Sequence, residues 1–192
     1  MQNSVSFPYF QKNNIVKINV RFLIFSLILM CFFALSVYFA SLIFAKSALE
    51  EVIDDELVWQ EVKNLPVDAA LIAKMIAEIE GIKRRSRQGI YCVQYVLYAS
   101  VSGYYPCFDN VIQNIYLKQG EIWKIGKTCM PTEKRYSPDY PDERLLLKRE
   151  FEGTAEQCLI VEKVKIYAYF YSKENQRREI PLTLPPGNKI YR

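Results

Sequence analysis

Ile122-Trp123-Lys124-Ile125-Gly126-Lys127-Thr128 is the stretch of sequence that decides the fold of this chain. Its branched and aromatic residues predict a short strand that ends at a glycine turn. Gln119-Gly120 stands just before it and predicts a tight hairpin leading into the strand. Lys134-Arg135-Tyr136 follows, and its arginine comes nine residues after Gly126. The stretch therefore combines a predicted strand, a glycine turn and a later arginine.

The residues on both sides of this stretch predict further strands and a helix. Residues 90–98 are rich in aromatic and branched side chains, which is typical of a buried central strand. Shorter strands are predicted at residues 104–108, 114–117 and 145–151. Thr154 and Gln157 form a capping box that opens a helix reaching about Ser172. This order predicts an α+β domain in which helices pack on a small mixed sheet.

An apolar run near the N-terminus predicts a single transmembrane helix. Residues 22–45 contain no charged side chain in 24 positions. At about 1.5 Å per residue the run spans about 36 Å, enough to cross a hydrocarbon core of about 30 Å with some tilt. The competing interpretation is a cleaved signal peptide, whose apolar core is typically about 7–15 residues long. Ala40, Ala45 and Ala48 would offer small residues for such cleavage.

The chain divides, on this interpretation, into four parts: a polar tail over residues 1–21, the transmembrane helix over 22–45, a helical linker over 46–88 and an α+β domain over 89–192. Within the linker, Asp68 predicts the start of a helix over residues 69–80 that ends at Gly81. Three Lys or Arg residues precede the membrane run and two follow it closely. That bias favours a single-pass protein with a cytoplasmic N-terminus and an extracytoplasmic C-terminal domain.

Composition excludes some kinds of site and leaves others open. The chain has no histidine, which excludes histidine-based triads and general bases. Its net charge of +4 does not by itself predict nucleic-acid binding. The basic cluster at residues 83–87 is either a solvated linker or a contact for lipid head groups or phosphates.

Four cysteines outside the membrane run lack a Cys-x-x-Cys pair, so a zinc site is not expected. These cysteines can form disulfides if the domain is exported, and they are free thiols if it is cytosolic. They are Cys92, Cys107, Cys129 and Cys158.

From Tyr91 onward the chain resembles a divergent GIY-YIG nuclease domain, similar to the C-terminal domains of Rhs-type polymorphic toxins and related hypothetical bacterial proteins. The segments that carry the resemblance are Ala99-Ser100, residues 102–106, residues 120–128, Arg135-Tyr136 and residues 184–189. They cover about half of the chain and leave residues 1–89 outside. The resemblance implies a GIY-YIG-like fold for the domain that follows the transmembrane helix.

The resemblance also implies a set of site residues. The family's pattern has a tyrosine on a first strand, a Tyr-Ile-Gly-like triplet on a second, then an arginine, a glutamate and an asparagine. The matching positions are Tyr95, Lys124-Ile125-Gly126, Arg135, Glu162 and Asn188. The pattern departs from the family at Lys124, where a tyrosine is expected, and in its longer spacings. The literal Gly-Ile-Tyr at residues 89–91 is the alternative to Tyr95, but it lies four residues too early.

The activity implied is hydrolysis of phosphodiesters with Mg²⁺ or another divalent cation, as in a nuclease or toxin-like effector. Glu162 would hold the metal, Arg135 the phosphate, Tyr95 and Lys124 would transfer protons, and Asn188 would position the groups. The alternative is a catalytically inactive binding or interaction module of the same fold at the cell envelope. The partners expected are a lipid bilayer, nucleic acid or an unidentified protein.

Each predicted residue also has an ordinary structural interpretation. These are a core tyrosine at 95, a surface lysine at 124, an exposed loop charge at 135, a pairing of Glu162 with Lys163 or Lys165, and a turn residue at Asn188. The catalytic interpretation therefore requires that these side chains converge on one cleft.

Overall fold

The computed structural model describes residues 20–53, 55–85, 90–108, 112–131 and 143–189. The chain divides into two compact units, Met1–Ala40 and Ser41–Arg192. The helices are α1 (Val20–Val52), α2 (Glu56–Val62), α3 (Ala69–Arg85), α5 (Ala155–Tyr169) and α6 (Lys173–Gln176). The strands are β1 (Tyr91–Ala99), β2 (Gly103–Pro106), β3 (Asn114–Leu117), β4 (Ile122–Thr128) and β5 (Leu145–Thr154).

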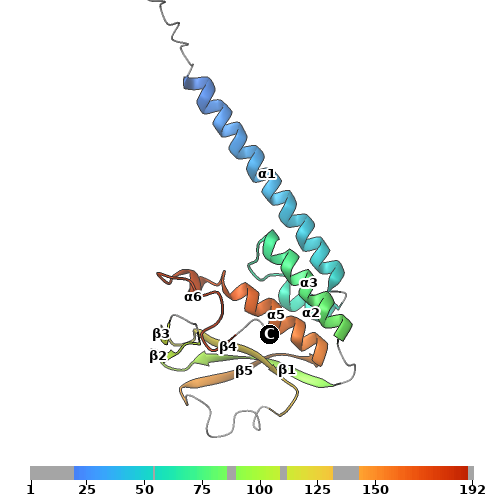
Figure 1. Cartoon of the computed structure of the whole chain (residues 1–192), viewed down its shortest axis with the longest axis vertical. Coiled ribbons are helices and arrows are strands. Elements are labelled where there is room, and N and C mark those ends of the chain that lie inside the picture. Colours follow the sequence, from blue (N-terminus) through green and yellow to red (C-terminus); the bar gives the residue numbers. More distant parts are fainter. Residues whose placement is uncertain (1–19, 54, 86–89, 109–111, 132–142, 190–192) are drawn as a thin grey trace, which may run out of the picture. The chain divides into compact units, whose positions relative to one another are not determined.

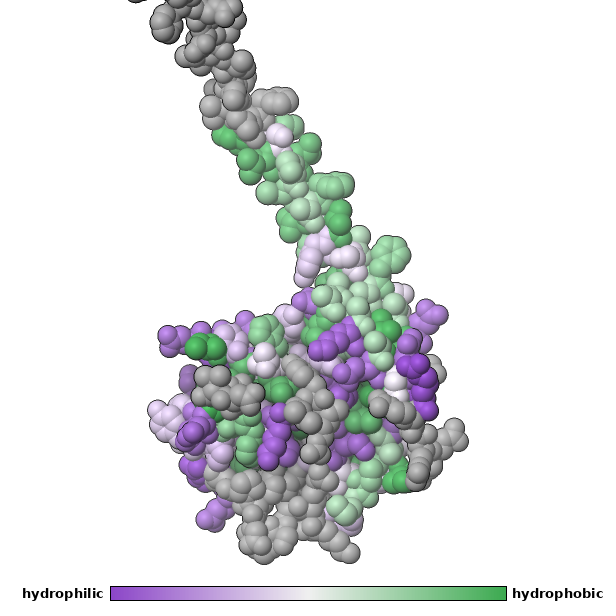
Figure 2. All heavy atoms as spheres, viewed as in Figure 1, coloured by the Kyte–Doolittle hydropathy of each residue, from purple (hydrophilic) through white to green (hydrophobic). Residues whose placement is uncertain are grey.

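Helix α1 contains the predicted membrane run. Its segment Ile24–Val52 has a mean hydropathy of 2.5, and none of its most apolar stretch is buried inside the protein. Green, apolar side chains predominate on the coloured part of this helix in Figure 2. By length and composition the helix fits a single membrane span, and a signal sequence near an N-terminus has the same features.

The main sheet has three strands in the order β4-β1-β5, and both pairings are antiparallel. Strands β2 and β3 form a separate antiparallel pair. The α+β class is confirmed, but the sheet is antiparallel where a mixed sheet was expected. Parallel neighbours need a crossover connection, whereas the segment between β1 and β4 contains the β2–β3 hairpin instead.

Two details of the chain around β4 differ from the sequence-based prediction. Gly120 has a φ of 84° and makes a turn, but this turn joins β3 to β4, which belong to different sheets, so it is not a hairpin. Gly126 does not end the strand, because β4 continues through it to Thr128. A bulge pairs Leu97 with Lys124 and Tyr98 with Ile122, which leaves Trp123 as the extra residue.

Helix α5 covers one face of the sheet, and α2 and α3 pack on α5 from the same side (Figure 1). The predicted capping box starts α5: Thr154 N–H donates to Gln157 Oε1 at 2.7 Å, and Gln157 N–H donates to Thr154 Oγ1 at 3.2 Å. An apolar core joins these helices to residues 41–53. Its buried members include Leu49, Ile53, Val58, Ile72, Met75, Val161 and Val164.

Helix α3 starts as predicted but ends later. Asp68 Oδ1 accepts from Leu71 N–H at 2.7 Å, as an N-cap residue does. The helix then passes through Gly81 and reaches Arg85. Ile79 and Ile82, on either side of the glycine, are buried in the helical core. That burial outweighs the glycine's cost of about 1 kcal/mol in a helix.

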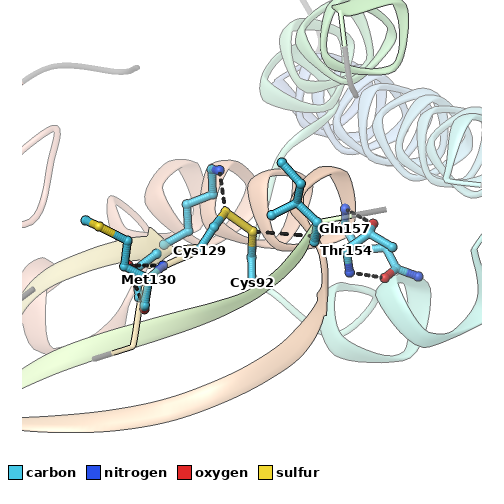
Figure 3. Close-up of a disulfide and its surroundings, with 8 residues drawn as sticks. Cys92, Cys129, Met130, Thr154 and Gln157 are labelled. Carbon is cyan, nitrogen blue, oxygen red and sulfur yellow. Dashed lines mark hydrogen bonds between the residues drawn. A yellow bond between two sulfur atoms is a disulfide. The ribbon is translucent and has the colours of Figure 1, made fainter. Parts of the chain in front are cut away.

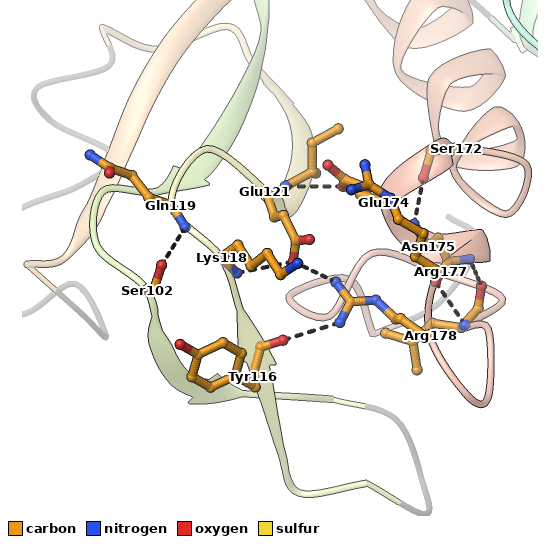
Figure 4. A network of polar contacts seen from close by, with 12 residues as sticks. Ser102, Tyr116, Lys118, Gln119, Glu121, Ser172, Glu174, Asn175, Arg177 and Arg178 are labelled. Carbon is orange, nitrogen blue, oxygen red and sulfur yellow. Dashed lines mark hydrogen bonds and ion pairs between the residues drawn. The ribbon is translucent and has the colours of Figure 1, made fainter.

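A polar network attaches the segment after α5 to the start of β4 (Figure 4). Ile122 N–H donates to Glu174 Oε1 at 3.1 Å, and Arg178 Nη2 lies 3.0 Å from Glu121 Oε2. Arg178 also donates to the carbonyl oxygen of Tyr116 on β3 at 3.1 Å. These contacts direct the C-terminal segment toward the outer edge of the sheet.

Candidate functional site

A pocket of about 300 Å³ lies beside β4, the strand at one end of the sheet order. Four of the five residues predicted for the site line it: Tyr95, Lys124, Glu162 and Asn188. The fifth, Arg135, lies within residues 132–142 and so outside the described residues. The remaining lining residues are Phe108, Ile125, Gly126, Ile166, Gly187 and Lys189.

Tyr95 reaches this pocket because the residue beside it is a glycine. Tyr95 on β1 pairs with Gly126 on β4, and the tyrosine is fully buried. A Cβ atom at position 126 would lie 2.6 Å from Cζ of the Tyr95 ring, closer than real contacts allow. The ring therefore occupies the space that any side chain at position 126 would need. This close approach, rather than a turn, is the reason for a glycine in β4.

The literal Gly-Ile-Tyr tyrosine lies elsewhere. Tyr91 is 63% exposed, and it lines a different pocket together with Cys92, Cys129 and Arg149. Its hydroxyl donates a hydrogen bond to Glu152. Of the two candidate tyrosines, only Tyr95 shares a pocket with Glu162.

Glu162 enters the pocket from α5. Its two lysine neighbours, which were its alternative partners, are directed to other carboxylates. Lys163 Nζ lies 2.8 Å from Glu78 on α3, and Lys165 Nζ lies 3.0 Å from Glu150 on β5 and bonds to Glu61 on α2. Ile166, one turn after Glu162 on the same helix, lines the same pocket, as the spacing of four residues places both on one helix face.

The C-terminal segment closes the other side of the pocket by pairing with β4. Asn188 Oδ1 accepts from Ile125 N–H at 3.0 Å, and Asn188 Nδ2 donates to the Ile125 carbonyl oxygen at 2.9 Å. Gly187 N–H donates to the Trp123 carbonyl oxygen at 2.6 Å. A Cβ at position 187 would lie 2.7 Å from the Trp123 ring, so a glycine is needed here too. Asn188 thus acts on the backbone of the strand that carries Lys124 and Gly126.

Among the described residues that line the pocket, the charged side chains are two lysines and one glutamate: Lys124, Lys189 and Glu162. These described side chains carry more positive than negative charge, which favours an anionic ligand. Sequence reasoning did not identify Lys189 or Phe108. The signal available was the position of Lys189 directly after the predicted Asn188.

A disulfide between Cys92 and Cys129 fixes the far end of β4 to the start of β1 (Figure 3). The register that pairs Val93 with Thr128 brings these neighbouring cysteines together, with their Cα atoms 4.0 Å apart. Cys107 and Cys158 are buried thiols, and burial raises the pKa of Cys158. The disulfide stands one residue after the strand that lines the pocket.

The residues that the structure describes form no closed metal cage. Within the described ranges, no group of three or more His, Cys, Asp or Glu side chains is placed to hold a metal ion. Glu162 supplies the carboxylate that lines the pocket. Mg²⁺ is commonly held by one or two carboxylates together with water, so a single carboxylate is compatible with this kind of binding.

Comparison of the chain with protein-family models, with curated proteins and with solved structures found no match. The relation to the GIY-YIG family therefore stays a prediction that depends on the order and spacing of residues in this sequence.

Proposed function

We propose that this chain is a membrane-anchored phosphodiesterase of GIY-YIG type, with its active site in the pocket beside β4. The observation that carries the proposal is the meeting of Tyr95, Lys124, Glu162 and Asn188 in one pocket. They come from β1, β4, α5 and the C-terminal segment, in the order of the family pattern, whose first two positions lie on strands.

Each side chain has a chemical role that fits its position. The ammonium group of Lys124, with that of Lys189, would bind the phosphate oxygens and balance the charge that develops on them. Tyr95 is assigned the proton exchange with the attacking water because no histidine is available, although its side chain is fully buried in this structure. Asn188 would hold β4, and with it Lys124, in register against the C-terminal segment.

A divalent cation fits the proposal through Glu162. Mg²⁺ bound there would stabilise the negative charge on the leaving oxygen. The Glu162 side chain would hold the ion beside the two lysines, and Ile166 and Ile125 would limit the entry of bulk water. Arg135, which the family pattern assigns to the phosphate, remains part of the proposal.

The proposal places the C-terminal unit outside the cytoplasm. The disulfide Cys92–Cys129 supports this, because disulfides persist in oxidising compartments and are rare in the cytosol. The excess of Lys and Arg before the membrane run points to the same orientation. The orientation can be tested by fusing to the C-terminus a reporter that is active only in the cytosol. Reporter activity in cells would contradict this orientation.

The direct test uses the full chain in detergent micelles, mixed with plasmid DNA, single-stranded DNA or RNA. We expect cleavage in Mg²⁺ and none in EDTA. The alternative is an inactive binding module, and one observation favours it: the Asn188 amide already bonds the backbone of Ile125 through both its oxygen and its nitrogen. Binding of nucleic acid without cleavage of any of the three substrates would decide for that alternative.

A further inference from the structure

The lining of the pocket includes an aromatic ring that the proposed chemistry does not use. Phe108 lines the pocket and keeps 38% of its surface exposed. Its backbone is fixed, because Phe108 N–H donates to the Pro186 carbonyl oxygen at 2.8 Å. A partly exposed aromatic ring that lines a pocket together with polar groups is a candidate contact for a ligand.

The ring has a rigid support on the protein side. Its centroid lies 6.1 Å from that of Trp123, with the two planes tilted by 57°. Trp123 is itself buried, and its indole N–H donates to the Pro106 carbonyl oxygen at 2.7 Å. Phe108 therefore has little freedom to turn into the core, and little order would be lost when a planar group stacks on it.

The ammonium group of a lysine lies over the same Phe108 ring. Lys189 Nζ lies 4.7 Å from the Phe108 centroid, and the lysine side chain is exposed. Lys189 and Lys124 both line the pocket. An aromatic ring beside ammonium groups is the combination by which proteins bind single-stranded nucleic acid: the ring stacks on a base and the cations contact the backbone.

We propose that Phe108 stacks on a base of single-stranded nucleic acid while Lys189 moves from the ring to a neighbouring phosphate. This inference rests on the proposed function, because it names the substrate class of the same pocket. Stacking needs a base that is not already stacked in a duplex, so the site selects single strands over double strands. DNA and RNA share the base and phosphate that these residues contact, and the experiment compares both.

The test measures binding of fluorescently labelled 12-nucleotide single strands to the full chain in detergent micelles, in EDTA so that cleavage does not interfere. Phe108→Leu keeps an apolar side chain and removes the ring face, and we expect it to weaken binding roughly 5- to 100-fold. Phe108→Trp should retain binding. Lys189→Gln should make the negative slope of log K against log salt shallower by about 0.7.

Matched controls come from positions outside the pocket. Tyr104→Leu removes an aromatic ring that is 68% exposed on β2, and Lys173→Gln removes an exposed cation on α6. Neither should change binding, and thermal unfolding should show that every variant folds. The inference is overturned if Phe108→Leu binds as the wild type does, if a duplex binds as tightly as the single strand, or if no strand binds.

The outcomes separate this inference from the proposed function. Phe108-dependent binding without hydrolysis in Mg²⁺ would uphold the stacking role and reject the phosphodiesterase. Hydrolysis in Mg²⁺ with binding that is unaffected by Phe108→Leu would do the reverse. A difference in affinity between the DNA and RNA strands would identify which of the two is bound in preference.

Discussion

The ring of Tyr95 fills the space that a side chain at position 126 would occupy, with Cζ only 2.6 Å from an ideal Cβ there. This contact between β1 and β4 explains why position 126 is a glycine. It lets a fully buried tyrosine line a pocket at the end strand of the sheet.

Gly126→Ala should therefore destabilise the protein by about 1–3 kcal/mol, the usual cost of forcing extra atoms into a packed region. The free energy of unfolding can be measured by urea denaturation. In a Tyr95→Leu background the same change should cost less, because the ring it meets is gone. Equal costs in both backgrounds would show that the ring is not the obstacle.

Asn188→Ala should act on stability as well as on activity. It removes two hydrogen bonds to the backbone of Ile125, at 3.0 and 2.9 Å, each worth about 1 kcal/mol. Hydrogen exchange of the Ile125 amide should become faster than in the wild type. If exchange there is unchanged, the asparagine does not hold the C-terminal segment on β4.

Reduction of the disulfide should cost stability without removing the fold's core. The bridge Cys92–Cys129 closes a sequence separation of 37 residues, for which the chain-entropy estimate is about 3–4 kcal/mol. The double variant Cys92→Ser with Cys129→Ser should unfold at a lower temperature, whereas Cys31→Ser should not change the unfolding of the C-terminal unit. Peptide mass mapping without reductant should recover Cys92 linked to Cys129. A linkage involving Cys107 or Cys158 would contradict the described pairing.

Glu174 should make stability depend on pH in a defined direction. Burial raises the pKa of its carboxyl above 4.5 and the nearby Glu121 adds to this, while the hydrogen bond from Ile122 N–H and the charge of Arg178 offset part of the rise. A carboxyl with a higher pKa in the folded state costs stability above that pKa, and the cost disappears as the pH falls toward 4.5.

Glu174→Gln keeps an oxygen to accept from Ile122 N–H and removes the charge. We expect it to raise the free energy of unfolding at pH 7 and to flatten its change between pH 7 and 4.5. Glu179→Gln, an exposed acid three residues after α6, serves as the control. A wild type and a Glu174→Gln variant with parallel pH profiles would show that Glu174 does not carry this dependence.

The elements of the fold were predictable where the signal is local. Branched and aromatic runs identified the strands, and the Thr154–Gln157 capping box identified the start of α5. These patterns depend on residues within one or two turns of each other. The end of α3 was missed, because burial of Ile79 and Ile82 against other helices is a tertiary effect that outweighs a local glycine signal.

The lining of the candidate pocket was predictable in part and for a different reason. Order and element type led to Tyr95, Lys124, Glu162 and Asn188, but the contact between Asn188 and Ile125 joins residues 63 apart in sequence. No local pattern reports such a contact, nor the placing of Phe108 at the pocket. The cysteine pairing was likewise open until the register of β1 against β4 was known.

The central claim is that Glu162 serves phosphodiester hydrolysis in the pocket beside β4. The most direct measurement is the rate of Mg²⁺-dependent cleavage of single-stranded nucleic acid by the wild type and by Glu162→Gln. Losing the proposed metal ligand removes several kcal/mol of transition-state stabilisation. We therefore predict that the cleavage rate falls by at least roughly 100-fold. Glu156→Gln, in the first turn of the same helix and outside the pocket lining, should retain the wild-type rate. Cleavage by folded Glu162→Gln at the wild-type rate would contradict the account.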